Sequence, residues 1–499
     1  MTDDVRVRLT TGAVLGRPSA RPGVVAFKGI PYAAPPVGAL RWRPPAPVTP
    51  WDGDRPAYDA GPAPVQPQPP RNAIMWHANF DDSHALVMSE DCLYLNVWTP
   101  DVTAGGLPVL FFLQGGGNRF GHGGQEIHDG AALARRGIVV VTCTMRLGAL
   151  GFLAHPELAA EDALGASGNY GVLDVLAALG WIREHIAAFG GDPDLVTFAG
   201  NSAGAAIVNH LMASTSAAGL FRAAIGQSAA GVGRAEGPLP PQAEAQQEGL
   251  QALGALAQAP LARLRRLCAT DLLLPAHLGV VLDGRALSED TDTVFAEGRQ
   301  HRLPLLAGWN TDEGANFTQP AAVAAMDRRL TESPHAAALA PYYPAGSDLQ
   351  RSARAFTGDT KFAGPVWTWA RAQAEVAPTW VYRFDQAPPL PADLDLAPPP
   401  DGGASYDVFH TAELPYVGDN LDVRQWPWTE ADRELARRTA DAWARFVADL
   451  DPNGPGLPAW PRFDGTDSAE AMVLNTSPAA EPVHRADVLR TLAGLPRPL

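Results

Sequence analysis

The stretch FAGNSAGAAI (198–207) places Ser202 between Gly200 and Gly204, in the pattern G-x-S-x-G. Apolar residues on both sides predict that a strand ends before the serine and that a helix begins after it. At such a turn the serine backbone is strained and its hydroxyl projects out of the fold. The flanking positions must be small, because a side chain there would collide with the neighbouring strand or helix. The same pattern also fits a glycine-rich turn with an incidental serine, so the rest of the chain has to decide.

Short apolar runs alternate with helix-spaced segments along the chain. The predicted strands are 107–113, 137–144, 194–200, 303–309 and 379–384, and the predicted helices are 171–190 and 429–450. Two proline-rich stretches, 61–70 and 388–403, predict surface loops. Alternating strands and helices indicate an α/β fold with a mostly parallel or mixed sheet covered on both faces. Sites in such sheets lie at the carboxyl ends of strands, where Ser202 follows.

The bulk composition excludes several classes of protein. The chain has 499 residues and a net charge of −16, which argues against nucleic acid and anionic membranes as partners. No apolar run approaches the roughly 18 residues of a membrane span, and the first ten residues, MTDDVRVRLT, do not have the pattern of a secretory signal. Only three cysteines, Cys92, Cys143 and Cys268, are present. We therefore expect a cytoplasmic, reducing environment.

A serine hydroxyl becomes a nucleophile when a histidine takes its proton and a carboxylate orients that histidine. Asp312 and Glu313 both follow the predicted strand 303–309, where an orienting acid is expected, and position alone does not separate them. Among the six histidines that follow Ser202, His210 lies on the helix that Ser202 begins and should point away. His410 lies in a loop after the last strong strand, where a base or a structural histidine would both fit.

The loop QGGGNRFGHGG (114–124) follows strand 107–113 and predicts an oxyanion hole. Its glycines allow backbone N–H groups to approach a developing oxyanion, and the N–H of Ala203 would complete the set. The loop lacks the G-x-G-x-x-G register of a dinucleotide site, because Phe120 occupies the last glycine position. No S-x-x-K surrounds either lysine, which excludes a serine–lysine hydrolase. His122 and His128 show no metal-binding spacing, so neither a metal nor a cofactor is expected.

Several segments together resemble the type-B carboxylesterases, the bacterial para-nitrobenzyl-esterase-like branch of the α/β-hydrolase family that also includes the cholinesterases. The resemblance covers nearly the whole chain. The matching segments are FKGIPYAAPPVGALRWRPP (27–45), SEDCLYLNVWTP (89–100), GNYGVLDVLAALGWIREHIAAFGGDP (168–193), DEG (312–314) and FHTAELPYV (409–417).

This resemblance implies one α/β-hydrolase domain over residues 1–499. A large, mostly parallel mixed sheet would be flanked by helices, with an antiparallel N-terminal extension and with helical and loop insertions that form an active-site gorge. It implies a carboxylic ester hydrolase that works through an acyl-enzyme, with a small-molecule ester as substrate. The roles that it implies are Ser202 as nucleophile, Glu313 as acid, His410 as base, and Gly116, Gly117 and Ala203 as the oxyanion hole. Ser228 would help to hold the acid.

Three residues depart from the family pattern. Gln114 replaces a histidine, Asn118 replaces an aromatic residue, and Asn201 replaces the acid that usually precedes the nucleophile. These neutral amides leave the triad and the oxyanion N–H groups intact, and they predict a site that favours neutral or even anionic esters over cationic ones. We expect a neutral, partly hydrophobic substrate. No cysteine precedes Cys92 in the sequence, so the disulfide that this segment forms in the family's extracellular members is not expected.

Two rival interpretations stay open on the sequence. The first is an enzyme repurposed on this fold as an acyltransferase, lyase or cyclase. The second is a non-catalytic interaction scaffold, although such proteins typically lose the serine that this chain keeps. The natural substrate is not specified, and a monomer and a homodimer are equally compatible with the sequence.

Overall fold

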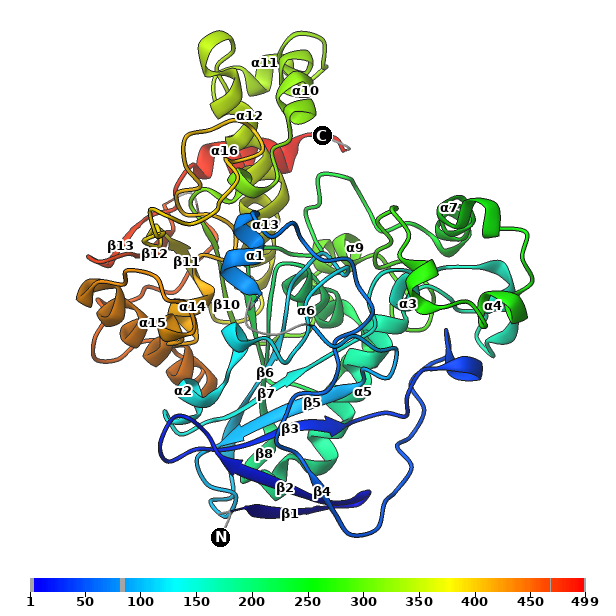
Figure 1. Ribbon diagram of the computed structural model, residues 1–499. Coiled ribbons are helices and arrows are strands. Elements are labelled where there is room, and N and C mark those ends of the chain that lie inside the picture. The colour runs from blue at the N-terminus through cyan, green and yellow to red at the C-terminus, as the bar shows by residue number, and fades with distance from the viewer. Residues whose placement is uncertain (1–3, 81–85, 467, 498–499) are drawn as a thin grey trace.

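A computed structural model describes residues 4–80, 86–466 and 468–497 (Figure 1). A sheet of 13 strands runs through the molecule in the order β1-β2-β3-β5-β7-β6-β8-β9-β10-β11-β12-β13, with β4 paired to β2. The strands are β1 (Val5–Leu9), β2 (Gly12–Pro18), β3 (Val25–Pro31), β4 (Asp54–Pro56), β5 (Tyr94–Thr99), β6 (Leu107–Leu113), β7 (Val139–Cys143), β8 (Gly191–Asn201), β9 (Ala223–Gln227), β10 (Leu305–Asn310), β11 (Thr379–Phe384), β12 (Glu470–Leu474) and β13 (Ala479–Pro482).

Helices flank this sheet and form two lobes beyond it (Figure 1). They are α1 (Ile74–Asn79), α2 (Ala131–Ala134), α3 (Gly148–Phe152), α4 (Pro156–Glu161), α5 (Tyr170–His185), α6 (Ala203–Ala213), α7 (Gln242–Leu253), α8 (Leu261–Leu264), α9 (Thr291–Ala296), α10 (Pro320–Thr331), α11 (Ala336–Leu339), α12 (Leu349–Gly358), α13 (Gly364–Ala374), α14 (Leu414–Val417), α15 (Glu430–Asp449) and α16 (Ala486–Gly494).

The expected mixed sheet is confirmed. The strands from β7 through β6, β8, β9, β10 and β11 to β12 are parallel, whereas β1, β2, β3 and β5 form an antiparallel extension at the N-terminal end. Parallel neighbours bring their carboxyl ends to one edge. The ends of β6, β8, β9 and β10 therefore meet at the edge that carries Ser202.

Alternate residues of the central strands enter two hydrophobic cores, one on each face of the sheet. On β6, Val109 and Phe111 pack in the cluster that contains α5, α6 and α13, whereas Leu110 packs in the cluster that contains α15. Because both faces are covered, β6 and β7 are apolar at nearly every position. This is the physical reason why the unbroken runs 107–113 and 137–144 predict strands correctly.

The predicted helices 171–190 and 429–450 are also present. The first is α5, and it tightens after His185 into a 3-10 turn because Gly190, at φ 84°, ends it in the left-handed region. The second is α15, where the hydroxyl of Thr429 accepts from the N–H of Asp432 and the Asp432 carboxylate accepts from the N–H of Thr429.

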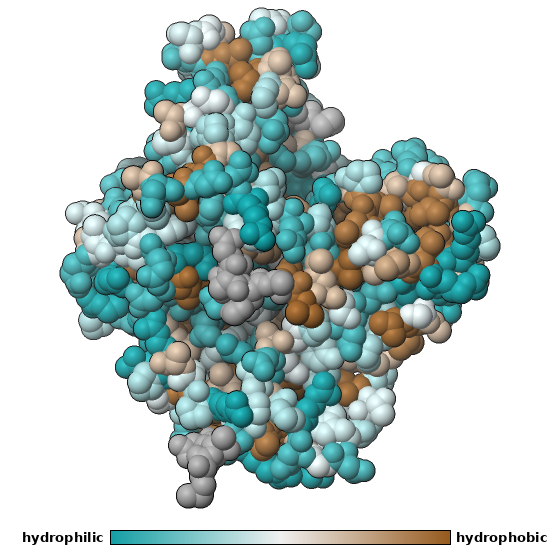
Figure 2. Space-filling view, in the orientation of Figure 1, coloured by the Kyte–Doolittle hydropathy of each residue, from teal (hydrophilic) through white to brown (hydrophobic). Residues whose placement is uncertain are grey.

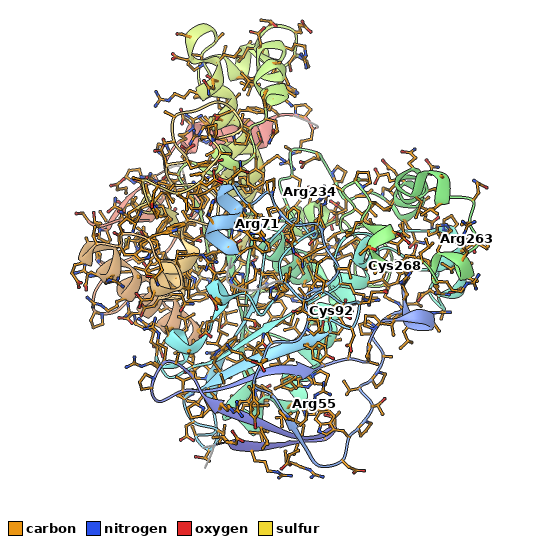
Figure 3. The ribbon with its side chains drawn as sticks, in the orientation of Figure 1. Arg55, Arg71, Cys92, Arg234, Arg263 and Cys268 are labelled. Carbon is orange, nitrogen blue, oxygen red and sulfur yellow. The ribbon has the colours of Figure 1, made fainter. Side chains whose placement is uncertain are left out.

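All three cysteines are free thiols, with Cys92 and Cys143 buried and Cys268 exposed. Cys92 and Cys268 are labelled in Figure 3. None of the helices in the described ranges is long and apolar enough to cross a membrane. Figure 2 shows hydrophobic residues gathered on the face beside α3 and α7. Leu164 and Leu273 are among the exposed large apolar side chains of the described residues.

Candidate active site

Ser202 lies between the end of β8 and the start of α6. Its backbone has φ 53° and ψ −126°, a strained geometry for any residue but glycine, and its N–H donates to the carbonyl of Gln227 at 2.7 Å. A Cβ on Gly200 would lie 2.5 Å from the backbone of Gly204, and a Cβ on Gly204 would lie 2.3 Å from the carbonyl oxygen of Leu113 on β6. The expectation that both flanking positions must be small is therefore confirmed.

The glycine loop after β6 lies directly against the serine. A Cβ on Gly115 would be 2.7 Å from the Cβ of Ser202. Gly116 and Gly117 have φ of 110° and 62°, which turn their amides out of any regular ladder. Within the described part of the chain, the N–H groups of Gly116, Gly117 and Ala203 donate no hydrogen bond. The arrangement therefore leaves three backbone donors beside Ser202 for a ligand.

His410 and Glu313 face each other in the interior. Nδ1 of His410 lies 3.7 Å from Oε2 of Glu313, and both side chains are almost completely buried. The other carboxylate oxygen of Glu313 accepts from the N–H of Asn310 at 2.9 Å, which fixes the carboxylate at the end of β10. A carboxylate in this position can orient the imidazole and stabilise its charged form.

Asp312 and Glu313 are adjacent in sequence but point to different partners. Asp312 forms a two-pronged ion pair with Arg354 of α12, at 2.8 Å to Nε and 2.6 Å to Nη2. Its carboxylate is thereby committed to a cation, and Glu313 is the acid that meets His410. Of the two acids that sequence position left open, Glu313 is the one whose carboxylate lies against His410.

Glu413, three residues after His410, is a functional candidate that the sequence reasoning missed. Its fully buried carboxylate accepts three amide N–H groups, and each donor stands at the carboxyl end of a different strand. The donors are Asn201 at 3.0 Å, Gln227 at 3.2 Å and Asn310 at 2.6 Å. The single acid in the segment FHTAELPYV was the available signal.

Through Glu413 the nucleophile turn and the histidine loop are tied together. Asn201 precedes Ser202, and Asn310 also donates to the carbonyl of Phe409, which precedes His410, at 2.9 Å. Burial raises the pKa of Glu413, and the nearby carboxylate of Glu313 raises it further, whereas the hydrogen bond from Asn310 lowers it. Two buried carboxyl groups thus share one region, and the charge of Glu313 favours the protonated form of Glu413.

Aromatic rings enclose the imidazole of His410. The ring of Phe362 lies 4.5 Å from it, centroid to centroid, and the ring of Phe317 lies 5.1 Å away, edge to face. Such packing holds the imidazole in one orientation and gives the site apolar walls.

The other side chains that the sequence analysis singled out, Ser228, Gln114 and Asn118, are buried and form few hydrogen bonds. Ser228 is fully buried with φ 58°, and in the described structure its hydroxyl has no hydrogen-bond partner, so its predicted support of Glu313 stays a prediction. Gln114 and Asn118 are buried in the glycine loop; both polar ends of Gln114 and the oxygen of Asn118 are likewise unpartnered among the described residues.

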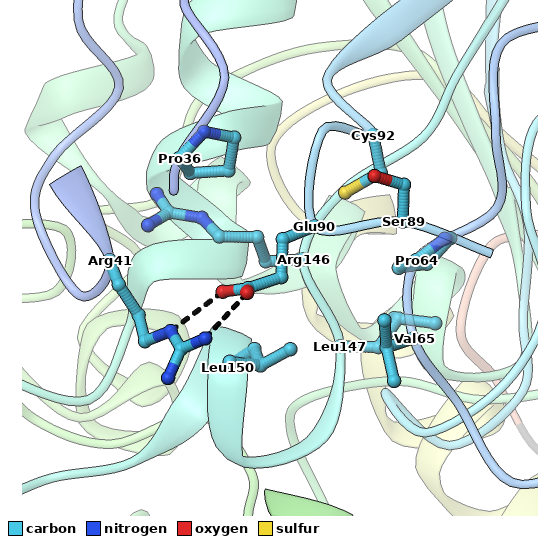
Figure 4. Close-up of a pocket in the computed structure, with 10 residues that line it drawn as sticks. All are labelled: Pro36, Arg41, Pro64, Val65, Ser89, Glu90, Cys92, Arg146, Leu147 and Leu150. Carbon is cyan, nitrogen blue, oxygen red and sulfur yellow. Dashed lines mark hydrogen bonds and ion pairs between the residues drawn. The ribbon is translucent and has the colours of Figure 1, made fainter. Parts of the chain in front are cut away.

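A separate narrow pocket, shown in Figure 4, does not include the triad candidates. It is lined by Pro36, Arg41, Pro64, Val65, Ser89, Glu90, Cys92, Arg146, Leu147 and Leu150. Arg41 is paired with Glu90 at 2.5 and 2.7 Å, and Arg146 is paired with the buried Asp174 at 2.7 Å. Because the charges are already satisfied by the protein, we assign this pocket a structural role.

The strand–serine–helix turn, the donor loop and the buried acid–histidine pair occur in a chain whose residues 3–488 match the model of the carboxylesterase family. The chain belongs to the carboxylesterase family. This carboxylesterase is 38% identical to the fumonisin B1 esterase of Sphingopyxis macrogoltabida, over 93% of this chain and 86% of that protein. It is 34% identical to the para-nitrobenzyl esterase of Bacillus subtilis, over 91% and 92% of the two chains.

Solved structures agree with the fold of this carboxylesterase. A thermophilic PNB esterase superposes with a TM-score of 0.82 at 32% identity, covering 98% of this chain and 99% of the other. A carboxylesterase of Geobacillus stearothermophilus gives a TM-score of 0.81 at 31% identity, with the same coverage. The α/β-hydrolase fold and the hydrolysis of carboxylic esters by a serine hydrolase follow from these findings.

Proposed function

We propose that this carboxylesterase cleaves its ester with Ser202 as nucleophile, His410 as general base and Glu313 as the orienting acid. The observation that carries the proposal is the buried contact of 3.7 Å between His410 and Glu313, on a loop that Glu413 ties to the serine turn. The strained backbone of Ser202 and the free amides beside it support the same assignment.

The reaction follows from these positions. His410 takes the proton of Ser202 as Oγ attacks the ester carbonyl, and the N–H groups of Gly116, Gly117 and Ala203 stabilise the oxyanion that forms. His410 then protonates the leaving alcohol, which leaves an acyl group on Ser202. Water, activated by the same imidazole, attacks the acyl carbonyl and releases the acid and the free serine.

The part of the substrate that reaches the serine is, in this proposal, neutral and partly hydrophobic. Phe317 and Phe362 line the histidine with apolar rings, and Gln114 and Asn118 supply uncharged polar groups. We also infer a bacterial, cytoplasmic protein. The three free thiols and the bacterial relatives support this inference, and fractionation of the native host tests it.

A fluorophosphonate probe tests the catalytic assignment. We expect one adduct per chain, mapped by mass spectrometry to Ser202, with loss of activity on a panel of p-nitrophenyl esters of graded acyl length. Ser202→Ala should take up no probe, whereas Ser477→Ala, a change at an exposed serine, should be labelled like the wild type. Labelling at another residue, or turnover by Ser202→Ala, would refute the assignment.

A further inference from the structure

The proline-rich segment 61–70 is buried at its centre, although its composition predicts a surface loop. Residues 63–66 are buried, and only 2% of Gln66 is exposed. The backbone of this segment is held in place, because the N–H of Ala63 donates to the carbonyl of Val87 at 2.9 Å. Gln66 therefore projects from a fixed position into the interior of the protein.

The amide of Gln66 binds both backbone polar groups of Gly121, a residue of the oxyanion loop. Its Oε1 atom accepts from the N–H of Gly121 at 2.7 Å, and its Nε2 atom donates to the carbonyl of Gly121 at 3.1 Å. Nε2 also donates to the carbonyl of Pro64 at 3.1 Å, which fixes the orientation of the side chain. Both donors of the amide are thereby used.

Gly121 is in close contact with the backbone that carries the proposed oxyanion donors. The carbonyl of Gly116 accepts from the N–H of Phe120 at 3.1 Å, so Gly121 directly follows a tight turn. A Cβ on Gly121 would lie 3.1 Å from the carbonyl oxygen of Gly115, and a Cβ on Gly115 would lie 2.7 Å from the Cβ of Ser202. A displacement of Gly121 would therefore shift the loop against the nucleophile.

The two ends of this loop are held by the sheet, whereas its middle is not. The loop leaves β6 after Leu113, and the carbonyl of Gly123 accepts from Thr142 of β7 at 2.7 Å and from Asn96 of β5 at 3.1 Å. Between these ends, Gln66 is the only side chain of the described residues that hydrogen-bonds to the backbone of residues 114–121.

We propose that Gln66 is a positioning residue that keeps the N–H groups of Gly116 and Gly117 in place beside Ser202. The inference rests on the proposed function, because it concerns the oxyanion hole assigned there. Backbone donors lower the barrier most when they are held in position before the charge develops on the oxygen. Without the amide of Gln66, two buried backbone groups of Gly121 would lose their partners, and the loop would have to move to satisfy them.

A pair of esters separates this positioning role from a purely structural one. The first is p-nitrophenyl butanoate, and the second is its thiono analogue, in which sulfur replaces the carbonyl oxygen. Sulfur is a weak hydrogen-bond acceptor, so the thiono ester gains less from the oxyanion donors. Misplaced donors should therefore slow the oxygen ester more, whereas a loss of folded protein should slow both esters equally.

We expect Gln66→Leu to lower the ratio of kcat/KM for the oxygen ester to that for the thiono ester by roughly tenfold, which is less than the loss of a whole donor. The change should appear in kcat, with KM nearly unaltered, when active enzyme is counted by fluorophosphonate titration. Gln66→Asn keeps the amide on a side chain that is one methylene shorter, and it should lower the ratio in the same direction by a smaller factor.

Gln68→Leu is the matched control, because Gln68 is an exposed glutamine of the same segment, and it should leave the ratio unchanged. Wild-type ratios in both Gln66 variants, whatever their melting temperatures, would overturn the inference and leave the proposed function standing. Failure of both variants to fold, or an equal loss in Gln68→Leu, would also overturn it. Absence of fluorophosphonate labelling at Ser202 in the wild type would instead refute the proposed function.

Discussion

Asn201 donates a hydrogen bond from its side-chain amide to the buried carboxylate of Glu413 at 3.0 Å. The residue that replaces the family's acid before the nucleophile is therefore in contact with a carboxylate from another segment. A carboxyl group therefore lies beneath the turn even though Asn201 itself has an amide side chain. Replacing Asn201 with an acid would place two carboxylates within hydrogen-bond distance, which is unfavourable for both when ionised.

We expect Glu413→Gln to destabilise the protein and to lower kcat. The carboxylate accepts three amide donors, and a glutamine would present an N–H₂ group to at least one of them. The loss should be about 1–3 kcal/mol in the free energy of unfolding, measured by urea denaturation. Glu248→Gln, at an exposed position on α7, is the control and should leave both quantities unchanged. A variant as stable and active as wild type would show that Glu413 does not position the turn.

The same residue predicts a pH dependence of stability. Burial raises the pKa of Glu413 in the folded protein, so between the unfolded and folded values the native state binds more protons. Its contribution to stability is therefore fully present below the unfolded value and is lost as the pH rises through the folded pKa. The difference in unfolding free energy between wild type and Glu413→Gln should shrink across that window, as denaturation at a series of pH values will measure. A difference that grows with pH would contradict the raised pKa.

Glu313 and Asp312 form a matched pair for testing the acid. Glu313→Gln should lower kcat/KM by roughly a hundredfold or more, because the imidazole of His410 loses its charge partner. Asp312→Asn breaks only the pair with Arg354, and kcat/KM should stay within roughly threefold of wild type. His410→Ala should be at least as damaging as Glu313→Gln, and the double variant should lose little more than His410→Ala alone, since triad members act as a unit. The reverse order of the two acid variants would reassign the acid.

Alanine substitutions at Gly204 and Gly180 should have opposite effects on the free energy of unfolding, because only Gly204 is closely packed against other backbone atoms. Gly204→Ala would place its Cβ 2.3 Å from the carbonyl oxygen of Leu113 and should destabilise by about 1–3 kcal/mol, with loss of activity. Gly180→Ala lies on α5, where a Cβ meets nothing within 4 Å, and should stabilise by about 0.5–1 kcal/mol. Thermal unfolding and esterase assays of both variants check the prediction. Equal effects from the two changes would mean that the turn tolerates a side chain at position 204.

The cysteines should differ sharply in reactivity. The hydroxyl of Thr270 donates to the exposed thiol of Cys268 and lowers its pKa, whereas burial raises the pKa values of Cys92 and Cys143. A thiol reagent should therefore modify Cys268 alone in the native protein and all three thiols after denaturation. Cys268→Ser should show no native reaction and keep its esterase activity. Rapid native labelling of Cys92 or Cys143 would indicate that their surroundings open.

Local sequence was sufficient for much of the fold and for part of the site. The apolar runs of β6 and β7, the cap at Thr429 and the small residues around Ser202 express preferences that act over a few neighbouring positions. Periodicity, helix capping and turn chemistry act over that range, so the ends of the strands and the serine turn can be predicted from the sequence alone. The family resemblance identified His410 as the candidate base. It also favoured Glu313 as the acid, whereas position in the sequence alone did not distinguish Glu313 from Asp312.

The tertiary structure decided what depends on segments far apart in the chain. Arg354 forms an ion pair with Asp312, 42 residues away in the sequence. Glu413 accepts a hydrogen bond from Asn201, 212 residues away. Hydrogen bonds and charge interactions act over ångströms in space, and no local pattern records which distant side chain will arrive at that distance. The serine turn is therefore encoded in its own ten residues, whereas the packing of the sheet edge determines which acid meets His410 and which carboxylate lies beneath the turn.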